Sequence, residues 1–319
     1  MPTLLITGAN RGIGLEAAAQ FAALEHCFDK IILTVRSADK GPGAIAAAAA
    51  KSGKPKALFS FQTLNLDSHV SCRAAVTALP SLDAVVLNAG GMGGEELTEH
   101  GVTKNFAMNV LGNAVLIEGL LAAGKIQKGA RVIYSTSEGT RSVWLFAGFQ
   151  PFVRLYKEEM EASMHSPPTR GTFGIGARQR MNTYANSKLI GGLWIATLAK
   201  EHPDIYFASV SPGGCGDTNV YLDMPQPFPF LMSFPAVIRA MNALGVMSSV
   251  EAAARRYVTA VTVETFPQTF PSGTVVGGPY LQISSTSEQL FDQSAFSSYY
   301  ADEVLMKEAA RVVRAAAEL

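Results

Sequence analysis

A tyrosine and a lysine at helical spacing, Tyr184 and Lys188, are the residues of this chain that most directly indicate chemistry. At positions i and i+4 of a helix, the two side chains share one face. A lysine ammonium beside a phenol favours the phenolate and lowers the phenol pKa by about 1 to 3 units. The pair therefore predicts a tyrosine that acts as a general acid or base near neutral pH.

A glycine-rich turn near the amino end predicts a phosphate-binding site. Residues 3–7 form a short apolar run typical of a buried strand, and a helical stretch begins at Leu15. In such a unit, backbone N–H groups at the helix start face a pyrophosphate. The turn has the spacing Gly-x-x-x-Gly-x-Gly (Gly8, Gly12 and Gly14), which differs from the Gly-x-Gly-x-x-Gly fingerprint. By itself, the segment also fits an ordinary tight turn between a strand and a helix.

Apolar runs that alternate with helical stretches along the chain predict a parallel sheet with right-handed crossovers. The expected strands are residues 3–7, 30–35, 57–61, 83–87, 130–136, 205–210 and, at the end, 274–276 with 280–283; a closing helix is expected over 301–318. The expected fold is an α/β, Rossmann-type doubly wound parallel sheet. It forms a single domain over residues 1–319, with a helical or loop insertion at about 140–183 and a lid at about 219–248.

The order of these motifs resembles that of the short-chain dehydrogenase/reductase family, in particular its carbonyl-reductase and retinol-dehydrogenase-like branch. The resemblance covers roughly residues 3–220, where residues 7–14 match the family's cofactor motif. It implies a catalytic tetrad of Asn109, Ser137, Tyr184 and Lys188.

The resemblance also implies a set of cofactor-binding residues. They are Gly8, Asn10, Arg11, Gly12, Ile13, Gly14, Arg36, Ser37, Asn65, Leu66, Asn88, Ala89, Gly90, Tyr184, Lys188, Pro212, Gly213 and Thr218. Near the adenine, Asn65 replaces the family's usual aspartate, and its amide can still hydrogen-bond the ring. After the sixth strand, the family's threonine position aligns with Asp217, and Thr218 comes one residue late.

The charge at the end of the second strand predicts NADPH/NADP+ as the cofactor. A carboxylate there would bind the ribose 2′-hydroxyl of NAD, whereas an arginine suits the 2′-phosphate of NADP. The chain has Arg36 at this place, Arg11 in the glycine turn, and no acidic residue between Ile31 and Ala38. Arginine offers forked donors to phosphate. Two solvated surface arginines are the alternative interpretation.

In the mechanism that the resemblance implies, hydride moves from the nicotinamide to a carbonyl carbon, and negative charge develops on the oxygen. Tyr184 would donate a proton to that oxygen, and Ser137 would hold it by a hydrogen bond. Lys188 would lower the pKa of Tyr184 and bind the nicotinamide ribose. Asn109 would fix a water that relays protons to solvent. Ser135 is a neighbouring candidate for the serine role.

Two segments depart from the family's minimal pattern and bear on the substrate and the assembly. Residues 138–183 form an insertion placed to wall the active site, and its resemblance to similar carbonyl reductases predicts a monomer or weak dimer. Residues 221–247 are rich in Phe, Met and Pro and correspond to the segment that covers the substrate. Prolines and Arg239 argue against a membrane span, so the segment predicts an apolar lid, with membrane-surface contact as the alternative. Both interpretations predict that the substrate is a bulky, apolar ketone or aldehyde.

Three functions stay open from the sequence. An NADPH-dependent carbonyl reductase or alcohol dehydrogenase is favoured. Reduction of a carbon–carbon double bond, as in protochlorophyllide reductase, is an alternative that the lack of cysteine in residues 138–183 disfavours, since Cys215 alone is expected near the pocket. A non-catalytic NADP(H)-sensing module is the third, and its signature would be a broken tetrad.

Composition agrees with a cytoplasmic enzyme. The chain is 48% hydrophobic and 16% charged, which suits a large core. The formal net charge of zero gives no electrostatic case for nucleic acid. Cys27, Cys72 and Cys215 have no metal-ligand spacing, which indicates reduced thiols inside the cell and no metal site. The first strand begins at residue 3, which leaves no room for a signal peptide.

Overall fold

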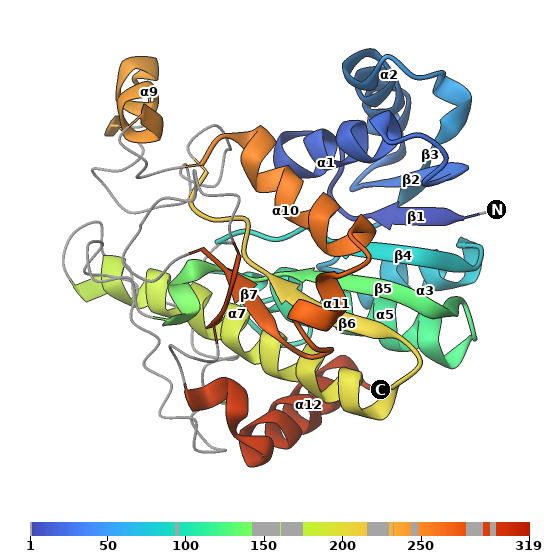
Figure 1. Cartoon of the computed structure of the whole chain (residues 1–319). Coiled ribbons are helices and arrows are strands. Elements are labelled where there is room, and N and C mark those ends of the chain that lie inside the picture. Colours follow the sequence, from blue (N-terminus) through green and yellow to red (C-terminus); the bar gives the residue numbers. More distant parts are fainter. Residues whose placement is uncertain are drawn as a thin grey trace.

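The described part of the chain forms an eight-stranded sheet with helices on both faces, as the computed structural model shows (Figure 1). The structure describes residues 2–92, 96–141, 160, 175–215, 230–231, 233–243, 248–278, 290–293 and 298–319. The strand order is β3-β2-β1-β4-β5-β6-β7-β8. Every neighbouring pair is parallel except β7 and β8, which are antiparallel. The chain winds outward in both directions from β1 and β4, so the predicted doubly wound topology is confirmed.

The strands follow the apolar runs of the sequence with small shifts. They are β1 (Thr3–Ile6), β2 (Lys30–Val35), β3 (Phe59–Thr63), β4 (Leu82–Leu87), β5 (Ile126–Ser135), β6 (Tyr206–Val210), β7 (Val275–Gly277) and β8 (Phe291–Asp292). The third strand begins two residues later than predicted, because residues 56–58 form a 3-10 turn. The expected continuation over 280–283 lies outside the described residues.

Two layers of helices enclose the sheet (Figure 1). One face carries α1 (Gly12–Ala23), α2 (Gly41–Ser52) and α10 (Val250–Thr262); the other carries α3 (His69–Ala78), α5 (Gly112–Ala122), α7 (Ile175–Glu201) and α12 (Glu303–Ala317). Shorter helices are α4 (Lys104–Phe106), a π-helical turn (Ala107–Leu111), α9 (Pro235–Ala243) and α11 (Phe266–Thr269). The closing helix predicted over 301–318 is thereby confirmed as α12.

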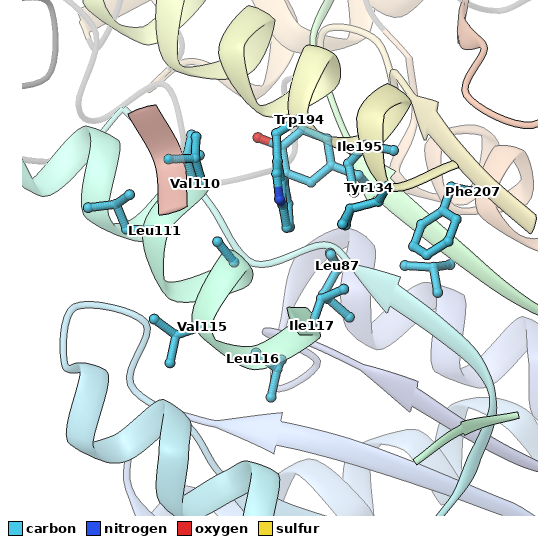
Figure 2. Close-up of a cluster of buried hydrophobic side chains, with 14 of the residues drawn as sticks. Leu87, Val110, Leu111, Val115, Leu116, Ile117, Tyr134, Trp194, Ile195 and Phe207 are labelled. Atoms are coloured by element: carbon cyan, nitrogen blue, oxygen red, sulfur yellow. The ribbon is translucent and has the colours of Figure 1, made fainter. Parts of the chain in front are cut away.

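The core on the α5 and α7 face is built from large side chains packed against β4, β5 and β6 (Figure 2). Trp194 and Tyr134 are fully buried and meet edge to face, with ring centres 6.4 Å apart. Burial of each such side chain stabilises the fold by about 1.5 to 3 kcal/mol. The Trp194 indole N–H donates to Glu118 Oε1 at 2.8 Å, which fixes α7 on α5.

The carboxyl end of α7 is fixed by the last helix. Arg314 of α12 donates through Nε to Glu118 Oε2 at 2.7 Å and through Nη1 to Glu201 Oε1 at 3.1 Å. The guanidinium therefore links α5, α7 and α12 at one point.

The insertion and the lid are only partly within the described residues. Of the insertion at 140–183, the structure describes residues 140–141, Met160 and 175–183, and this last part is helical because α7 begins at Ile175. Of the lid at 219–248, it describes residues 230–231, 233–243 and Ser248. Phe230, Leu231 and Phe234 are exposed, and α9 stands apart from the sheet (Figure 1).

One helical stretch of the described residues, 104–122, is long and apolar enough to span a membrane, with a mean hydropathy of 1.3. It is 72% buried inside the protein. Core helices pass the same test of length and composition, and this stretch packs in the core of Figure 2.

Candidate functional site

The candidate residues gather at the carboxyl ends of β1, β4, β5 and β6. The glycine turn follows β1, residues 88–90 follow β4, Ser137 follows β5, and residues 211–213 follow β6. Parallel strands direct these ends to one edge of the sheet, where open α/β folds bind ligands. The order reverses between β1 and β4, so the glycine turn lies at this switch point.

The glycine turn is shaped by positive backbone angles and a close contact. Gly8 and Gly12 have φ of +64° and +55°, a region that favours glycine. A Cβ atom at Gly14 would lie 2.5 Å from Nδ2 of Asn88 and 2.6 Å from the carbonyl oxygen of Gly8. No side chain fits at Gly14, so the start of α1 can approach the turn and leave its N–H groups available to an anion.

The turn after β4 is locked to β1 by two hydrogen bonds. Asn88 Nδ2 donates to the carbonyl oxygen of Thr7 at 2.9 Å, and the N–H of Ala89 donates to Thr7 Oγ1 at 2.9 Å. These contacts hold Asn88, Ala89 and Gly90 beside the glycine turn. The three residues thus form one side of the candidate dinucleotide-binding site.

The two arginines proposed for a 2′-phosphate are both exposed at this edge. Arg11 is the residue before α1, and Arg36 follows β2, with half-buried Ser37 next to it. Asn10 and Ile13 are half-buried within the turn.

The turn after β3 places Asn65 and Leu66 close to α5. Asn65 is half-buried and its Oδ1 accepts from the N–H of Asp67 at 3.3 Å. A Cβ at Gly112 would lie 2.2 Å from the carbonyl oxygen of Leu66. Gly112 therefore allows this turn to pack directly on the helix.

Asn109 lies in the π-helical turn and is fully buried. Its Oδ1 accepts from the N–H of Gly91 at 3.0 Å, and its Nδ2 donates to the Gly91 carbonyl at 2.7 Å. Nδ2 also lies 3.3 Å from Ser187 Oγ of α7. The side chain thus joins the turn after β4 to the helix that carries Tyr184 and Lys188.

Ser137, Tyr184 and Lys188 come together beside Asn109. The Ser137 hydroxyl lies close enough to the Tyr184 phenol to act on its pKa as a hydrogen-bond partner. Lys188 is buried; its Nζ donates to the carbonyl oxygen of Ser135 at 2.8 Å and lies 5.9 Å from the centre of the Tyr184 ring. Ser135 Oγ instead accepts from the Tyr257 hydroxyl at 2.7 Å, which leaves Ser137 as the hydroxyl facing the tyrosine.

The expected lowering of the Tyr184 pKa is wrong. Burial raises the pKa of Tyr184 above its ordinary value, and the hydrogen bond to Ser137 opposes that rise only in part. Burial also lowers the pKa of Lys188 to about 7, so the lysine carries less positive charge than an exposed one. The helical spacing brings Lys188 Nζ to 5.9 Å from the Tyr184 ring, but desolvation is the largest cause of both pKa shifts.

The turn after β6 begins with Ser211, Pro212 and Gly213. Gly213 has φ of +82°, and its N–H donates to Ser211 Oγ at 3.2 Å. Thr218 and Asp217, which bear on the carboxamide contact, lie outside the described residues. Cys215 is buried and forms a β-bridge with Ser248.

Three residues that border the site were not predicted. Glu138 directly follows Ser137, and Arg256 and Tyr257 reach the same strand ends from α10. Arg256 is buried, although its place beside Arg255 in the sequence is typical of a solvated helix face. Its helical spacing from two buried alanines, Ala253 and Ala260, is the signal that could have revealed it.

Comparison with known proteins gives consistent results. The family model described as short chain dehydrogenase matches residues 2–147. The protein named Short chain dehydrogenase FGM9, from Gibberella zeae, is 32% identical over 236 residues, which are 70% of this chain and 64% of that protein. This chain therefore spans less than two thirds of that relative.

Solved structures share the fold. An uncharacterized protein from Mycobacterium paratuberculosis aligns with a TM-score of 0.65 and 19% identity over 100% of this chain and 94% of that one. An enzyme described as an NADH-dependent reductase of alginate metabolism aligns with a TM-score of 0.53 and 18% identity over 87% of this chain and 95% of that one.

Proposed function

Because this chain belongs to the short-chain dehydrogenase/reductase family, we propose that it is an NADPH-dependent carbonyl reductase. The Ser137 hydroxyl acts on the Tyr184 phenol, and Lys188 Nζ lies 5.9 Å from the centre of the Tyr184 ring; this grouping is the observation that carries the proposal. A half-buried phenol beside a hydroxyl can polarise and protonate a carbonyl oxygen that reaches them. Asn109 contacts the helix that carries Tyr184 and Lys188, because its Nδ2 lies 3.3 Å from Ser187 Oγ of α7.

The residues present fit a bound dinucleotide. Gly14 and Gly90 are cradles that a side chain would fill: a Cβ at Gly90 would lie 2.5 Å from Asn109 Oδ1 and 3.0 Å from Lys188 Nζ. Residues 8–14 would hold the pyrophosphate, residues 88–90 the ribose side, and Lys188 the nicotinamide ribose. Bound NADPH would supply the hydride.

The protonation state of the site suits reduction. A raised pKa keeps the Tyr184 phenol protonated at neutral pH, so it can give its proton to an oxygen on which charge develops. Ser137 would donate a hydrogen bond to the same oxygen. Oxidation of an alcohol would need the phenolate, which burial disfavours.

NADPH is proposed over NADH on the basis of charge. Arg11 and Arg36 are exposed beside the candidate dinucleotide-binding site, and arginine binds phosphate through forked donors. We propose a bulky, apolar ketone or aldehyde as substrate because of the apolar segment 221–247. The expected assembly, a monomer or weak dimer, is tested by light scattering, and a stable tetramer would contradict it.

The direct test follows NADPH absorbance with a panel of ketones, aldehydes and quinones, and with NADH for comparison. Tyr184→Phe should lower kcat by about 10²-fold or more, because a general acid contributes that much. Tyr206→Phe is the matched control: its hydroxyl donates to the Phe270 carbonyl at 2.7 Å, away from the tetrad, so activity should persist. Equal activity of Tyr184→Phe and the native protein would refute the proposed mechanism.

The same assay separates the alternatives. Reduction of an enone at its carbon–carbon bond, seen by mass and NMR of the product, would assign a double-bond reductase. Tight NADPH binding without turnover of any carbonyl would assign a sensing module.

A further inference from the structure

A buried ion pair lies directly behind the proposed site. Arg256 of α10 has a side chain only 1% exposed, and its Nη1 lies 3.5 Å from Oε1 of Glu138, whose side chain is 13% exposed. Glu138 follows Ser137 in the chain. The pair therefore joins helix α10 to the segment that carries the proposed oxyanion-binding hydroxyl.

Each partner also binds the backbone after another strand. Arg256 Nη1 donates to the carbonyl oxygen of Ser211, after β6, at 2.7 Å. Glu138 Oε1 accepts from the N–H of Gly278, after β7, at 2.8 Å. Two side chains thus connect the ends of three neighbouring strands, β5, β6 and β7, at the edge where the site lies.

Two glycines leave room for this arrangement. A Cβ at Gly277 would lie 3.0 Å from Glu138 Oε1, and one at Gly278 would lie 3.1 Å from Arg256 Nη2. Both contacts are closer than side-chain carbons normally make with fixed neighbours. The backbone after β7 therefore approaches the ion pair as closely as glycine permits.

Stability alone does not account for a charged pair here. A buried ion pair is often no more stable than well-packed apolar residues of similar volume, because desolvation offsets the attraction. The charged pair instead provides specific geometry, because its hydrogen bonds hold particular backbone atoms at fixed distances and angles. The atoms fixed are those of the turns that flank the proposed substrate carbonyl and nicotinamide.

The same helix makes a second link to the tetrad. Tyr257, next to Arg256, donates to Ser135 Oγ at 2.7 Å, and the Ser135 carbonyl accepts from Lys188 Nζ. One face of α10 thus supports both the serine segment and the lysine. Packing of α10 on β5 and β6 would hold both at once.

We propose that Arg256 and Glu138 are positioning residues, which set Ser137 relative to the turn formed by residues 211–213. The proposal rests on the proposed function, in which Ser137 binds the carbonyl oxygen and that turn borders the nicotinamide. Hydride transfer needs the two reacting carbons about 3 to 3.5 Å apart, and small misplacements are costly. The ion pair acts on this distance without touching substrate.

The first test measures geometry without activity. Hydrogen exchange of the full chain is compared for the native protein, Glu138→Gln and Arg256→Lys. The amide that replaces Glu138 keeps an acceptor but loses the charge, so exchange should rise together in residues 137–140, 211–214 and 277–278. A rise confined to residues next to the substituted one would overturn the proposal.

The second test measures chemistry. In Glu138→Gln, single-turnover hydride transfer from NADPH should slow about 10- to 100-fold, while the Kd of NADPH changes less than about threefold. The deuterium isotope effect on kcat should rise, since hydride transfer becomes limiting. Arg131→Lys is the matched control, because Arg131 Nη1 binds the Ala260 and Val263 carbonyls at the far end of α10. Equal slowing in this control would overturn the proposal.

The two tests separate failure of the proposal from failure of the proposed function. A native protein without turnover would refute the carbonyl-reductase function, and hydrogen exchange would still decide whether the pair couples the turns. Thermal unfolding confirms that each variant is folded at the assay temperature. A hydride-transfer rate unchanged in both Glu138→Gln and Arg256→Lys would overturn the positioning role.

Discussion

Replacement of Lys188 by methionine should change how stability depends on pH. The lysine is buried, and its pKa falls from an ordinary 10.5 to about 7 in the folded, ligand-free protein. Between these two values the unfolded chain binds a proton that the folded chain does not. The free energy of unfolding therefore rises with pH through this window, and it loses that contribution as the pH falls toward 7.

The size of the effect follows from the pKa difference. Each pH unit within the window adds about 1.4 kcal/mol to the unfolding free energy. From pH 7 to about pH 9.5, Lys188 thus contributes about 3 kcal/mol of pH dependence. Methionine is similar in length and neutral, so Lys188→Met should lack this slope. Below about pH 7 the lysine is protonated in both states and its contribution becomes constant.

The assay is urea unfolding of both ligand-free proteins, followed by circular dichroism at several pH values. The difference between them removes titrations that both share, such as the buried Cys72, whose raised pKa lowers stability at alkaline pH in each protein. NMR of lysine labelled at the ε-carbon gives the pKa directly. A difference that does not vary from pH 7 to about pH 9.5 would refute the argument, because Lys188 would then be charged throughout.

Gly14→Ala should weaken NADPH binding at least about tenfold, because the alanine Cβ would clash with Asn88 and the glycine turn. Gly43→Ala, whose Cβ would lie in open space on α2, should leave NADPH affinity unchanged. Fluorescence titration measures the NADPH affinity of both variants. Lys125→Met should lower the unfolding free energy, measured in urea, by about 1 to 3 kcal/mol, because Lys125 Nζ donates to three carbonyls at the end of α3. A variant with unchanged stability and unchanged NADPH affinity would show that these hydrogen bonds contribute nothing. His69 stacks on His100, and burial lowers the pKa of His69, so stability should fall as the pH drops below about 6.5; His69→Phe should reduce this slope, and an unchanged slope in acid unfolding would contradict the assignment.

Local patterns predicted the fold and the place of the candidate residues. The apolar runs end where the strands end, to within a few residues, because strands of a parallel sheet buried on both faces are predominantly apolar. The glycine turn could also be predicted from the sequence, because Gly8 needs a positive φ and Gly14 has no room for a Cβ within one strand–turn–helix unit. The spacing of Tyr184 and Lys188 placed both on the helix that became α7.

Properties that depend on distant residues were not predictable in the same way. The raised pKa of Tyr184 comes from burial, which spacing along a helix does not reveal. Arg256 meets Glu138 across 118 positions of the chain, and neither residue has a local signature for the contact. The Asn109 contact with Gly91 likewise depends on a π-helical turn that no propensity predicts. Cofactor preference and substrate depend on side chains that meet only around a ligand.

The length of α7 makes the carboxyl end of the chain a mechanical support for catalysis. The helix has 27 residues, about 40 Å at 1.5 Å per residue, and Tyr184 lies about 25 Å from Glu201 at its far end. Over that lever arm, a tilt of about 2° moves the tyrosine by about 1 Å, and such a misplacement can slow a reaction about 10²-fold. Arg314, five residues before the last one, holds the far end through Glu201. Deletion of Arg314 and the residues after it would therefore release the carboxyl end of α7 and displace Tyr184, although the deleted residues lie far from the site.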